Sequence, residues 1–230
     1  MNGPKKLMSV VVEKKVIAEG ICLVVLEIKE KLVYKPGQYI SLRVSEEGHR
    51  RSYSVAKYEN NKISLIVDVS PKGLGSLFVE KLEVGSEVEV LGFLGNFTIE
   101  SLEKIKNVYF VATGTGIVPF GPMVEMVLGD GYKGKVFLSW GLRHVGGLYW
   151  MDYLEGIKKK YSNFDFEIYL SKPEVEWRGK VGHVGDNLDL LEIEESAWYL
   201  CGGNEMISQM KERLVAKGVA EENINYEKFY

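Results

Sequence analysis

Twelve residues in the middle of the chain, Val108–Pro119, combine a strand, a glycine turn and a helix start. They read VYFVATGTGIVP, and the β-branched and aromatic run that opens them is typical of a buried parallel strand. Two glycines then let the backbone turn sharply and let another group come close. A helix N-terminus at such a turn offers unpaired N–H groups and a positive dipole end, which suit a phosphate. The residues expected at this phosphate site are Thr113, Gly114, Thr115, Gly116 and Pro119.

The spacing of this turn is G-x-G-x-x-P, whereas the dinucleotide-binding fingerprint of Rossmann folds is G-x-G-x-x-G. Taken alone, the turn also fits an ordinary tight connection between a strand and a helix. Other segments of the chain therefore have to decide between a nucleotide site and a simple turn.

A second segment, Arg51–Ser54, reads R-S-Y-S within a strand pattern. Alternate residues of a strand share a face, which places Arg51 with Tyr53 and Ser52 with Ser54. Arginine can hold a phosphate through two hydrogen bonds, an aromatic ring can stack on a planar heterocycle, and a hydroxyl can bond a ring nitrogen. The alternative is a surface strand whose tyrosine belongs to an ordinary barrel wall.

A second candidate phosphate site follows at Gly73, Gly75 and Ser76, just before a short helical pattern. Glycines allow close approach of the backbone, and the serine can cap the helix or bond an anion. A capped junction between a loop and a helix, without any ligand, is the alternative interpretation.

The order R-x-Y-S, G-T-G-I-x-P-F and C-G-G, the last within Tyr199–Gly203, resembles the ferredoxin–NADP reductase family of flavoenzymes. The resemblance extends from about Val10 to Tyr230. It implies that Arg51 contacts a flavin phosphate, Tyr53 lies against the flavin, and Ser54 sits beside its reactive ring. The FAD-binding residues that it implies are Arg51, Ser52, Tyr53, Ser54, Gly73, Gly75, Ser76, Phe229 and Tyr230.

The resemblance also places Cys201 beside the nicotinamide ring, with Gly202 and Gly203 closing the same strand. Asn204 stands where proline is common in the family, and Cys201 also fits a small buried residue that ends a strand. In relatives a terminal aromatic covers the flavin and a nearby glutamate helps proton transfer. These roles would fall to Phe229 or Tyr230 and to Glu227, unless a last edge strand simply covers the core. Together, the resemblance assigns catalytic roles to Ser54, Cys201, Glu227 and Tyr230.

NADPH differs from NADH by one phosphate, which cations must meet. The candidate residues follow the second and third strands that the sequence predicts beyond Asn107. They are Arg143, Ser171, Lys172, Arg178 and Lys180. NADP-specific relatives often carry arginine where this chain has Lys172 and Lys180. The clustering of these cations favours NADPH, with NADH as the open alternative.

Two halves with different sequence rhythm predict two domains. Short alternating segments up to about Gly95 indicate a six-stranded antiparallel β-barrel, which the resemblance makes FAD-binding. From Asn107 strands alternate with helices, which indicates a Rossmann-like parallel sheet with helices on both faces. The predicted domains are residues 1–100, binding FAD, and 101–230, binding NAD(P). The predicted helices are Gly75–Leu82, Pro119–Leu128, Leu148–Lys160 and Glu205–Lys217.

Composition excludes several function classes. The chain has 230 residues, with 29 basic against 32 acidic side chains and a net charge of −3, which gives no support to nucleic-acid binding. Its 2 cysteines cannot ligate an iron–sulfur cluster, and its 3 histidines show no metal-ligand spacing. Glycines and prolines interrupt the apolar stretch Val108–Leu128, so no membrane span is expected. Without a signal-peptide pattern, we expect a cytoplasmic protein.

The expected function is electron transfer between NADPH and a small carrier, ferredoxin or flavodoxin, through bound FAD. Three alternatives stay open: an NAD(P)H:flavin reductase that releases reduced flavin, an electron-transfer subunit of a larger complex, and a flavin-binding module without turnover. An acidic carrier would dock on basic residues, for which Arg50, Lys72 and Lys228 are candidates.

Overall fold

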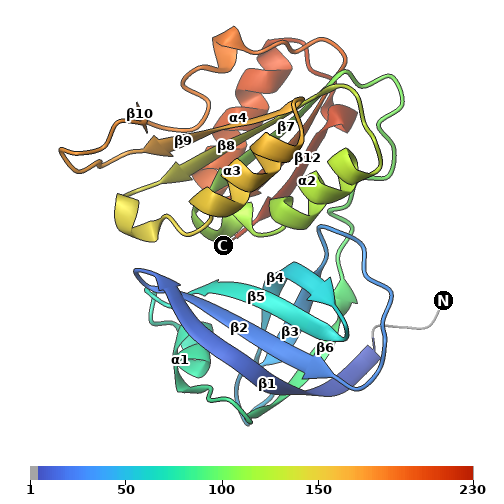
Figure 1. The fold of residues 1–230 in the computed structure, drawn as a ribbon, viewed down its shortest axis with the longest axis vertical. Coiled ribbons are helices and arrows are strands. Elements are labelled where there is room, and N and C mark those ends of the chain that lie inside the picture. The colour runs from blue at the N-terminus through green and yellow to red at the C-terminus, as the bar shows by residue number, and fades with distance from the viewer. Residues whose placement is uncertain (1–4, 230) are drawn as a thin grey trace. The chain divides into compact units, whose positions relative to one another are not determined.

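The computed structural model describes residues 5–229 of the chain. They form two compact units, one running to Thr98 with the addition of Gly121–Met123, and the other comprising Ile99–Phe120 and the chain from Val124 (Figure 1). None of the helices within residues 5–229 is long and apolar enough to cross a lipid bilayer.

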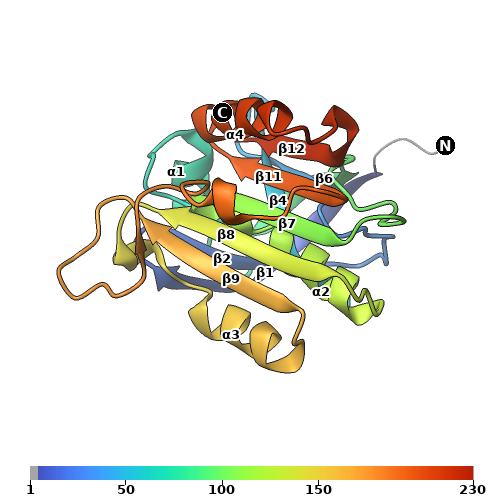
Figure 2. The ribbon, with the colours of Figure 1, turned by 90° about the horizontal axis from the view of Figure 1, so that it is seen from above.

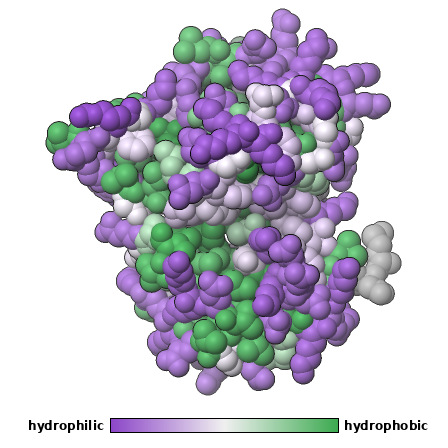
Figure 3. Space-filling view, viewed as in Figure 1, coloured by the Kyte–Doolittle hydropathy of each residue, from purple (hydrophilic) through white to green (hydrophobic). Residues whose placement is uncertain are grey.

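The first unit is a closed antiparallel barrel with the strand order β1-β2-β5-β4-β3-β6. Its elements are β1 (Lys5–Ala18), β2 (Ile21–Ile28), β3 (Tyr39–Arg43), β4 (Arg50–Glu59), β5 (Lys62–Asp68), α1 (Leu74–Lys81) and β6 (Glu87–Leu94). Alternating aliphatic side chains such as Leu26, Ile40 and Leu65 fill the interior and are completely buried. On the face seen in Figure 3, polar and apolar side chains are mixed over the outside of the barrel.

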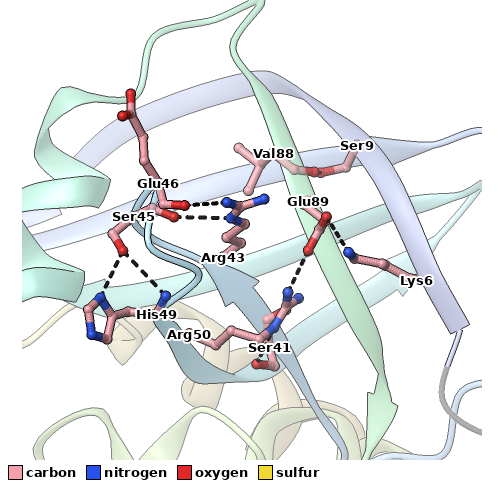
Figure 4. A network of polar contacts seen from close by, with 10 residues as sticks. All are labelled: Lys6, Ser9, Ser41, Arg43, Ser45, Glu46, His49, Arg50, Val88 and Glu89. Atoms are coloured by element: carbon pink, nitrogen blue, oxygen red, sulfur yellow. Dashed lines mark hydrogen bonds and ion pairs between the residues drawn. The ribbon is translucent and has the colours of Figure 1, made fainter.

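A polar network ties four strands of the barrel together (Figure 4). The Arg50 side chain donates to the Ser41 carbonyl oxygen at 2.7 Å and pairs with Glu89 at 2.6 Å. Glu89 also pairs with Lys6 at 2.8 Å, so the network joins β1, β3, β4 and β6. Arg50 therefore supports the barrel, whereas its neighbour Arg51 points to the other face of β4.

The second unit is a six-stranded parallel sheet with the order β10-β9-β8-β7-β11-β12. Its strands are β7 (Asn107–Thr113), β8 (Lys135–Leu142), β9 (Phe164–Leu170), β10 (Lys180–Val181), β11 (Ser196–Gly202) and β12 (Ile224–Lys228). Its helices are α2 (Phe120–Gly129), α3 (Met151–Lys160) and α4 (Asn204–Ala216), with the 3₁₀ turns η1 (Gly114–Ile117), η2 (Val145–Gly147), η3 (Leu188–Leu190) and η4 (Glu221–Asn223).

Helices cover both faces of this sheet, α2 and α3 on one side and α4 on the other (Figure 2). Ile207, Met210 and Leu214 of α4 pack on the sheet face that carries the stacked rings of Tyr109 and Trp198. The chain builds β7, β8 and β9 outward in one direction and then returns to place β11 on the other side of β7. The carboxyl ends of β7 and β11 therefore form the switch point where open α/β sheets bind ligands.

The fold class predicted from the sequence, an antiparallel barrel followed by a parallel α/β sheet, is confirmed. Element ends differ by a few residues. The first strand of the barrel, whose alternating pattern indicates a strand over Val10–Ala18, begins at Lys5, and its first residues pair with β6. The predicted helix Leu148–Lys160 begins later, at Met151, because η2 and an aromatic segment occupy the preceding residues.

Candidate cofactor and coenzyme sites

In the barrel, β4 and the start of α1 come together as the sequence predicts. A Cβ atom at Gly75 would lie 2.5 Å from Tyr53 Oη and 3.0 Å from Arg51 Cγ. The glycine lets the start of α1 lie directly against the Arg51 and Tyr53 side chains. The Arg51 Nη1 group donates to the Arg50 carbonyl oxygen at 2.8 Å, and the Tyr53 ring is half-buried against the barrel core.

The first turn of α1 is suited to an anion. Gly73 precedes the helix in an extended conformation, and no side chain caps the helix N-terminus. The first turn carries no acidic residue, and its leading N–H groups have no intrahelical partner by geometry. The predicted capping role of Ser76 is not seen, since its hydroxyl donates to the Asp68 carbonyl oxygen at 3.4 Å.

Ser54 carries a buried hydroxyl that lacks a hydrogen-bond partner among residues 5–229. Its side chain lies in the barrel wall, 7% exposed, opposite Tyr39 of β3. A buried polar atom without a partner destabilises the protein unless a ligand satisfies it. A flavin dinucleotide has phosphates and ring nitrogens that need such groups, and β4 offers them on both of its faces: Arg51 and Tyr53 with the open start of α1 on one, and the Ser54 hydroxyl on the other. Ser52, on the same face of β4, is exposed.

In the nucleotide unit, the glycine turn and the C-G-G segment meet at the switch point. The Gly203 N–H donates to Thr113 Oγ1 at 3.3 Å, which joins the ends of β7 and β11. A Cβ at Gly116 would overlap the backbone carbonyl of Cys201. Likewise, a Cβ at Gly202 would overlap Thr113, and Gly202 has a φ of +151°. Close packing of backbone on backbone therefore assembles this site from segments almost 90 residues apart.

Cys201 ends β11 and is completely buried. Burial raises the pKa of the Cys201 thiol well above its ordinary value, and the negative charge of Glu227 raises it further. The two residues are opposite each other in the pairing of β11 with β12. A thiol in this setting stays protonated at neutral pH, and a protonated thiol is a poor nucleophile.

The carboxyl-terminal segment lies against the same turn. The Phe229 N–H donates to the Gly202 carbonyl oxygen at 2.9 Å, just beyond β12. The edge strand that the sequence left as an alternative is therefore present, and it brings Glu227 and Phe229 to the C-G-G segment. Tyr230 lies outside the described residues.

The candidate phosphate cations fall into two groups. The Lys172 N–H donates to the Arg143 carbonyl oxygen at 2.9 Å, and that of Ser171 to Leu142 at 3.0 Å, so the loops after β8 and β9 lie side by side. Both cationic side chains of this group are exposed.

Arg178 and Lys180 instead line an open hollow of about 470 Å³, whose lining includes neither Arg143 nor Lys172. Lys180 Nζ pairs with Glu167 at 3.4 Å, which partly neutralises its charge. Glu167 also accepts hydrogen bonds from Tyr169 and Asn187, both at 2.7 Å. Sequence reasoning missed Glu167, because nothing along the chain signals that the 173–180 loop returns to β9.

Two family models match the chain. The oxidoreductase FAD-binding domain covers residues 9–99, and the oxidoreductase NAD-binding domain covers residues 110–212. The matched segments contain the β4–α1 site and the glycine turn with the C-G-G segment, respectively.

Curated relatives agree with these domains. The electron transfer component of toluate 1,2-dioxygenase from Pseudomonas putida is 30% identical over 203 residues, which are 86% of this chain and 60% of the relative. Ferredoxin–NADP reductase B from Sorangium cellulosum is 26% identical over 86% of each chain. The chain thus spans about 60% of the length of some of the curated relatives that it matches.

Solved structures show the same two-domain fold. The cytochrome P450 reductase GcoB from Amycolatopsis superposes with a TM-score of 0.91 at 26% identity, covering 100% of this chain and 71% of the neighbour. This chain therefore contains two domains. The FAD-binding domain carries the R-x-Y-S residues on β4, and the NAD-binding domain carries the glycine turn that packs against the C-G-G segment. The chain belongs to the ferredoxin reductase-like family of FAD-dependent oxidoreductases.

Proposed function

We propose that the chain is an FAD-dependent reductase that takes electrons from NADPH and delivers them to a small redox carrier, a ferredoxin or a flavodoxin. Residues 1–100 would hold FAD and residues 101–230 the coenzyme. The observation that carries the proposal is that each unit packs a glycine turn against a segment distant in sequence, Gly75 against Arg51 and Gly116 against Cys201, and we infer a phosphate site at each. A chain with one nucleotide ligand would need only one of them.

The chemistry belongs to the flavin, which, when bound, accepts a hydride from NAD(P)H and can release electrons singly. The residues of the barrel would bind and orient it. Arg51 and the first turn of α1 supply positive charge to its phosphates, and Tyr53 supplies an aromatic face. Ser54 Oγ would donate a hydrogen bond to a ring nitrogen and so gain the partner that residues 5–229 do not give it.

The residues of the nucleotide unit would bind the coenzyme and orient its nicotinamide. Thr113, Gly114, Thr115, Gly116 and Pro119 form the turn for the diphosphate, with Gly202 and Gly203 as its opposite wall. Cys201 would bound the nicotinamide site with a neutral thiol, and Glu227 stands next to it as a proton-holding group. We expect Cys201→Ala to slow hydride transfer and to leave flavin binding intact.

The preference for NADPH rests on Arg143 and Lys172, which the paired loops bring together. The Ser171 hydroxyl would join them at the extra phosphate, since the Ser171 N–H already donates to the Leu142 carbonyl oxygen. Arg178 and Lys180 contribute less in this proposal, since Lys180 already has the carboxylate of Glu167 as its partner.

A second candidate is a reductase component that serves an oxygenase. It is favoured by the toluate 1,2-dioxygenase relative and by a similar relative, the electron transfer component of anthranilate 1,2-dioxygenase from Acinetobacter baylyi. This chain spans 60% and 67% of these two relatives. A carrier supplied on another chain would then take the electrons.

The test is purification through gel filtration, identification of the released flavin, and carrier reduction with NADPH and NADH. Stoichiometric FAD and rapid reduction of ferredoxin or flavodoxin would support the proposal. A colourless protein that oxidises NADPH only when free flavin is added would replace it with the flavin reductase. Retained FAD with no reduction of either carrier would point to the oxygenase component.

A further inference from the structure

A buried tryptophan of β8 holds one peptide group of the glycine turn. Trp140 is completely buried, and its indole Nε1 donates to the Gly114 carbonyl oxygen at 2.9 Å. The register of β8 against β7 sets Trp140 opposite Ala112 and Gly141 opposite Thr113. The indole thus lies where β7 ends and the turn begins.

This hydrogen bond fixes the direction of the next N–H group. The only cis peptide bond within residues 5–229 is Gly92–Phe93, so the peptide that joins Gly114 to Thr115 is trans. In a planar trans peptide the C=O and N–H bonds point in opposite directions. With the Gly114 carbonyl directed at the buried indole, the Thr115 N–H points away from the indole at a turn where Gly114 is exposed.

The turn needs such a constraint because glycine does not supply one. Gly114 has a φ of +56°, and apart from its chain neighbours no atom of residues 5–229 lies within 4 Å of the place where its Cβ would stand. Glycine can adopt more than one backbone conformation at low energy, so the hydrogen bond from the indole selects one of them. The indole itself is held by the Tyr149 ring, which packs edge-on against it at 5.1 Å between ring centroids.

We propose that Trp140 is a positioning residue for the coenzyme, which orients the Gly114–Thr115 peptide so that the Thr115 N–H donates to the diphosphate of NAD(P)H. This inference rests on the proposed function. The reverse orientation would turn a carbonyl oxygen, with its partial negative charge, toward the phosphate. Trp140 therefore favours coenzyme binding in two ways. It leaves the Thr115 N–H free to donate to the phosphate, and it turns the Gly114 carbonyl oxygen away from the phosphate.

The test compares Trp140→Phe with Trp198→Phe in the FAD-loaded protein. Trp198 is an equally buried tryptophan of the same sheet, but its Nε1 donates to Ser196 Oγ at 2.8 Å, at the amino end of β11. Binding of ADP-ribose by calorimetry reports on the diphosphate. A hydride donor without phosphate, 1-benzyl-1,4-dihydronicotinamide, reports on the rest of the site.

We expect Trp140→Phe to weaken ADP-ribose binding about tenfold and to raise the KM for the coenzyme by a similar factor, with kcat within about twofold. The reaction with the phosphate-free donor and the content of FAD should stay unchanged. Trp198→Phe should change none of these quantities. If Trp140→Phe does not fold, the isostere β-(3-benzothienyl)alanine at position 140 removes the N–H and keeps the shape.

Unchanged ADP-ribose affinity in a folded Trp140 variant would overturn the inference. Equal losses with the coenzyme and with the phosphate-free donor would also overturn it, because they would show a general structural role. If the unaltered protein binds neither coenzyme nor ADP-ribose, the proposed function itself fails. That outcome is distinct, since it is seen before any substitution is made.

Discussion

The ligand sites that we propose for the barrel and for the parallel sheet are built in different ways. In the barrel, side chains on one face of β4, Arg51 and Tyr53, reach the start of α1. In the sheet, backbone groups at the ends of β7 and β11 pack directly on each other, with Gly116 against Cys201. The barrel site therefore depends on which side chains are present, and the sheet site on the absence of side chains. Substitutions of side chains at the barrel site should therefore weaken ligand binding by degrees. Substitutions of glycines at the sheet site should cause severe steric clashes.

The largest effect is expected from Gly116→Ala. Its new Cβ would overlap the Cys201 carbonyl, and neighbouring backbone cannot move aside as a side chain can. We expect a loss of about 3 kcal/mol in the free energy of unfolding of the nucleotide unit, together with loss of coenzyme binding. Chemical denaturation and NADPH titration measure the two quantities.

Two alanine substitutions serve as controls for this steric argument. Gly75→Ala meets the movable end of the Tyr53 side chain, so its cost should be smaller, about 1 kcal/mol. Gly156→Ala lies within α3 with open space around the new Cβ, and should stabilise the protein by about 1 kcal/mol. Equal costs for Gly116→Ala and Gly75→Ala would contradict the contrast between the two sites.

The next effect in size concerns Arg51. Removing a charge-assisted hydrogen bond to a phosphate should weaken FAD binding by about 1.5–3 kcal/mol, as measured by flavin fluorescence after dialysis of Arg51→Ala. Arg51→Lys should lie between this variant and the unaltered protein, because lysine keeps the charge without the planar fork. Lys57→Ala, on the same strand, is the matched control and should retain FAD. Full retention by Arg51→Ala would remove this residue from the proposed site.

A smaller effect is expected for coenzyme selectivity. Lys172→Ala should weaken NADPH about tenfold more than NADH, since an exposed lysine gives a single phosphate contact of about 1.4 kcal/mol. Lys180→Ala should have a smaller effect on the preference for NADPH over NADH, because Glu167 already pairs with the Lys180 ammonium group in the unaltered protein. Steady-state KM values for both coenzymes measure this. The same loss for NADPH and NADH in Lys172→Ala would reject its role at the extra phosphate.

The smallest effect is a pH dependence from Cys201. Its folded pKa is raised, so its contribution to stability is complete below the unfolded pKa of about 8.5 and declines as the pH rises above that value. The slope is at most about 1.4 kcal/mol per pH unit. Between pH 8.5 and 9.5, we expect Cys201→Ala to lose less stability than the unaltered protein in denaturant titrations. Parallel curves would show that the thiol is not buried as described.

The sequence predicted the barrel and the alternating α/β half because both have strong periodic patterns. It assigned Thr113–Gly116 and Cys201–Gly203 to the coenzyme only through the family resemblance, and the contact between the two segments is seen only in the structure. Other features depend on contacts that no local pattern encodes. Trp140 reads as a core residue of a buried strand, and only the three-dimensional structure shows its indole N–H on the Gly114 carbonyl.

Charge pairing shows the same limit of sequence reasoning. Arg50, Lys72 and Lys228 are equivalent as isolated cations, and each is a candidate for docking an acidic carrier. The structure pairs Arg50 with Glu89 and Lys72 with Glu80, while Lys228 lies over the Tyr226 ring at 5.7 Å. Which cations remain available is therefore decided by the contacts that the fold makes, and for Arg50 the partner is 39 residues away in sequence.

The most direct test of the account is anaerobic rapid mixing of the FAD-loaded protein with NADPH or NADH, with the visible flavin absorption as the signal. We predict that the bound flavin is reduced by both coenzymes, and at lower concentrations by NADPH. Bound flavin that stays oxidised with either coenzyme would contradict the claim that this chain passes electrons from NAD(P)H to FAD.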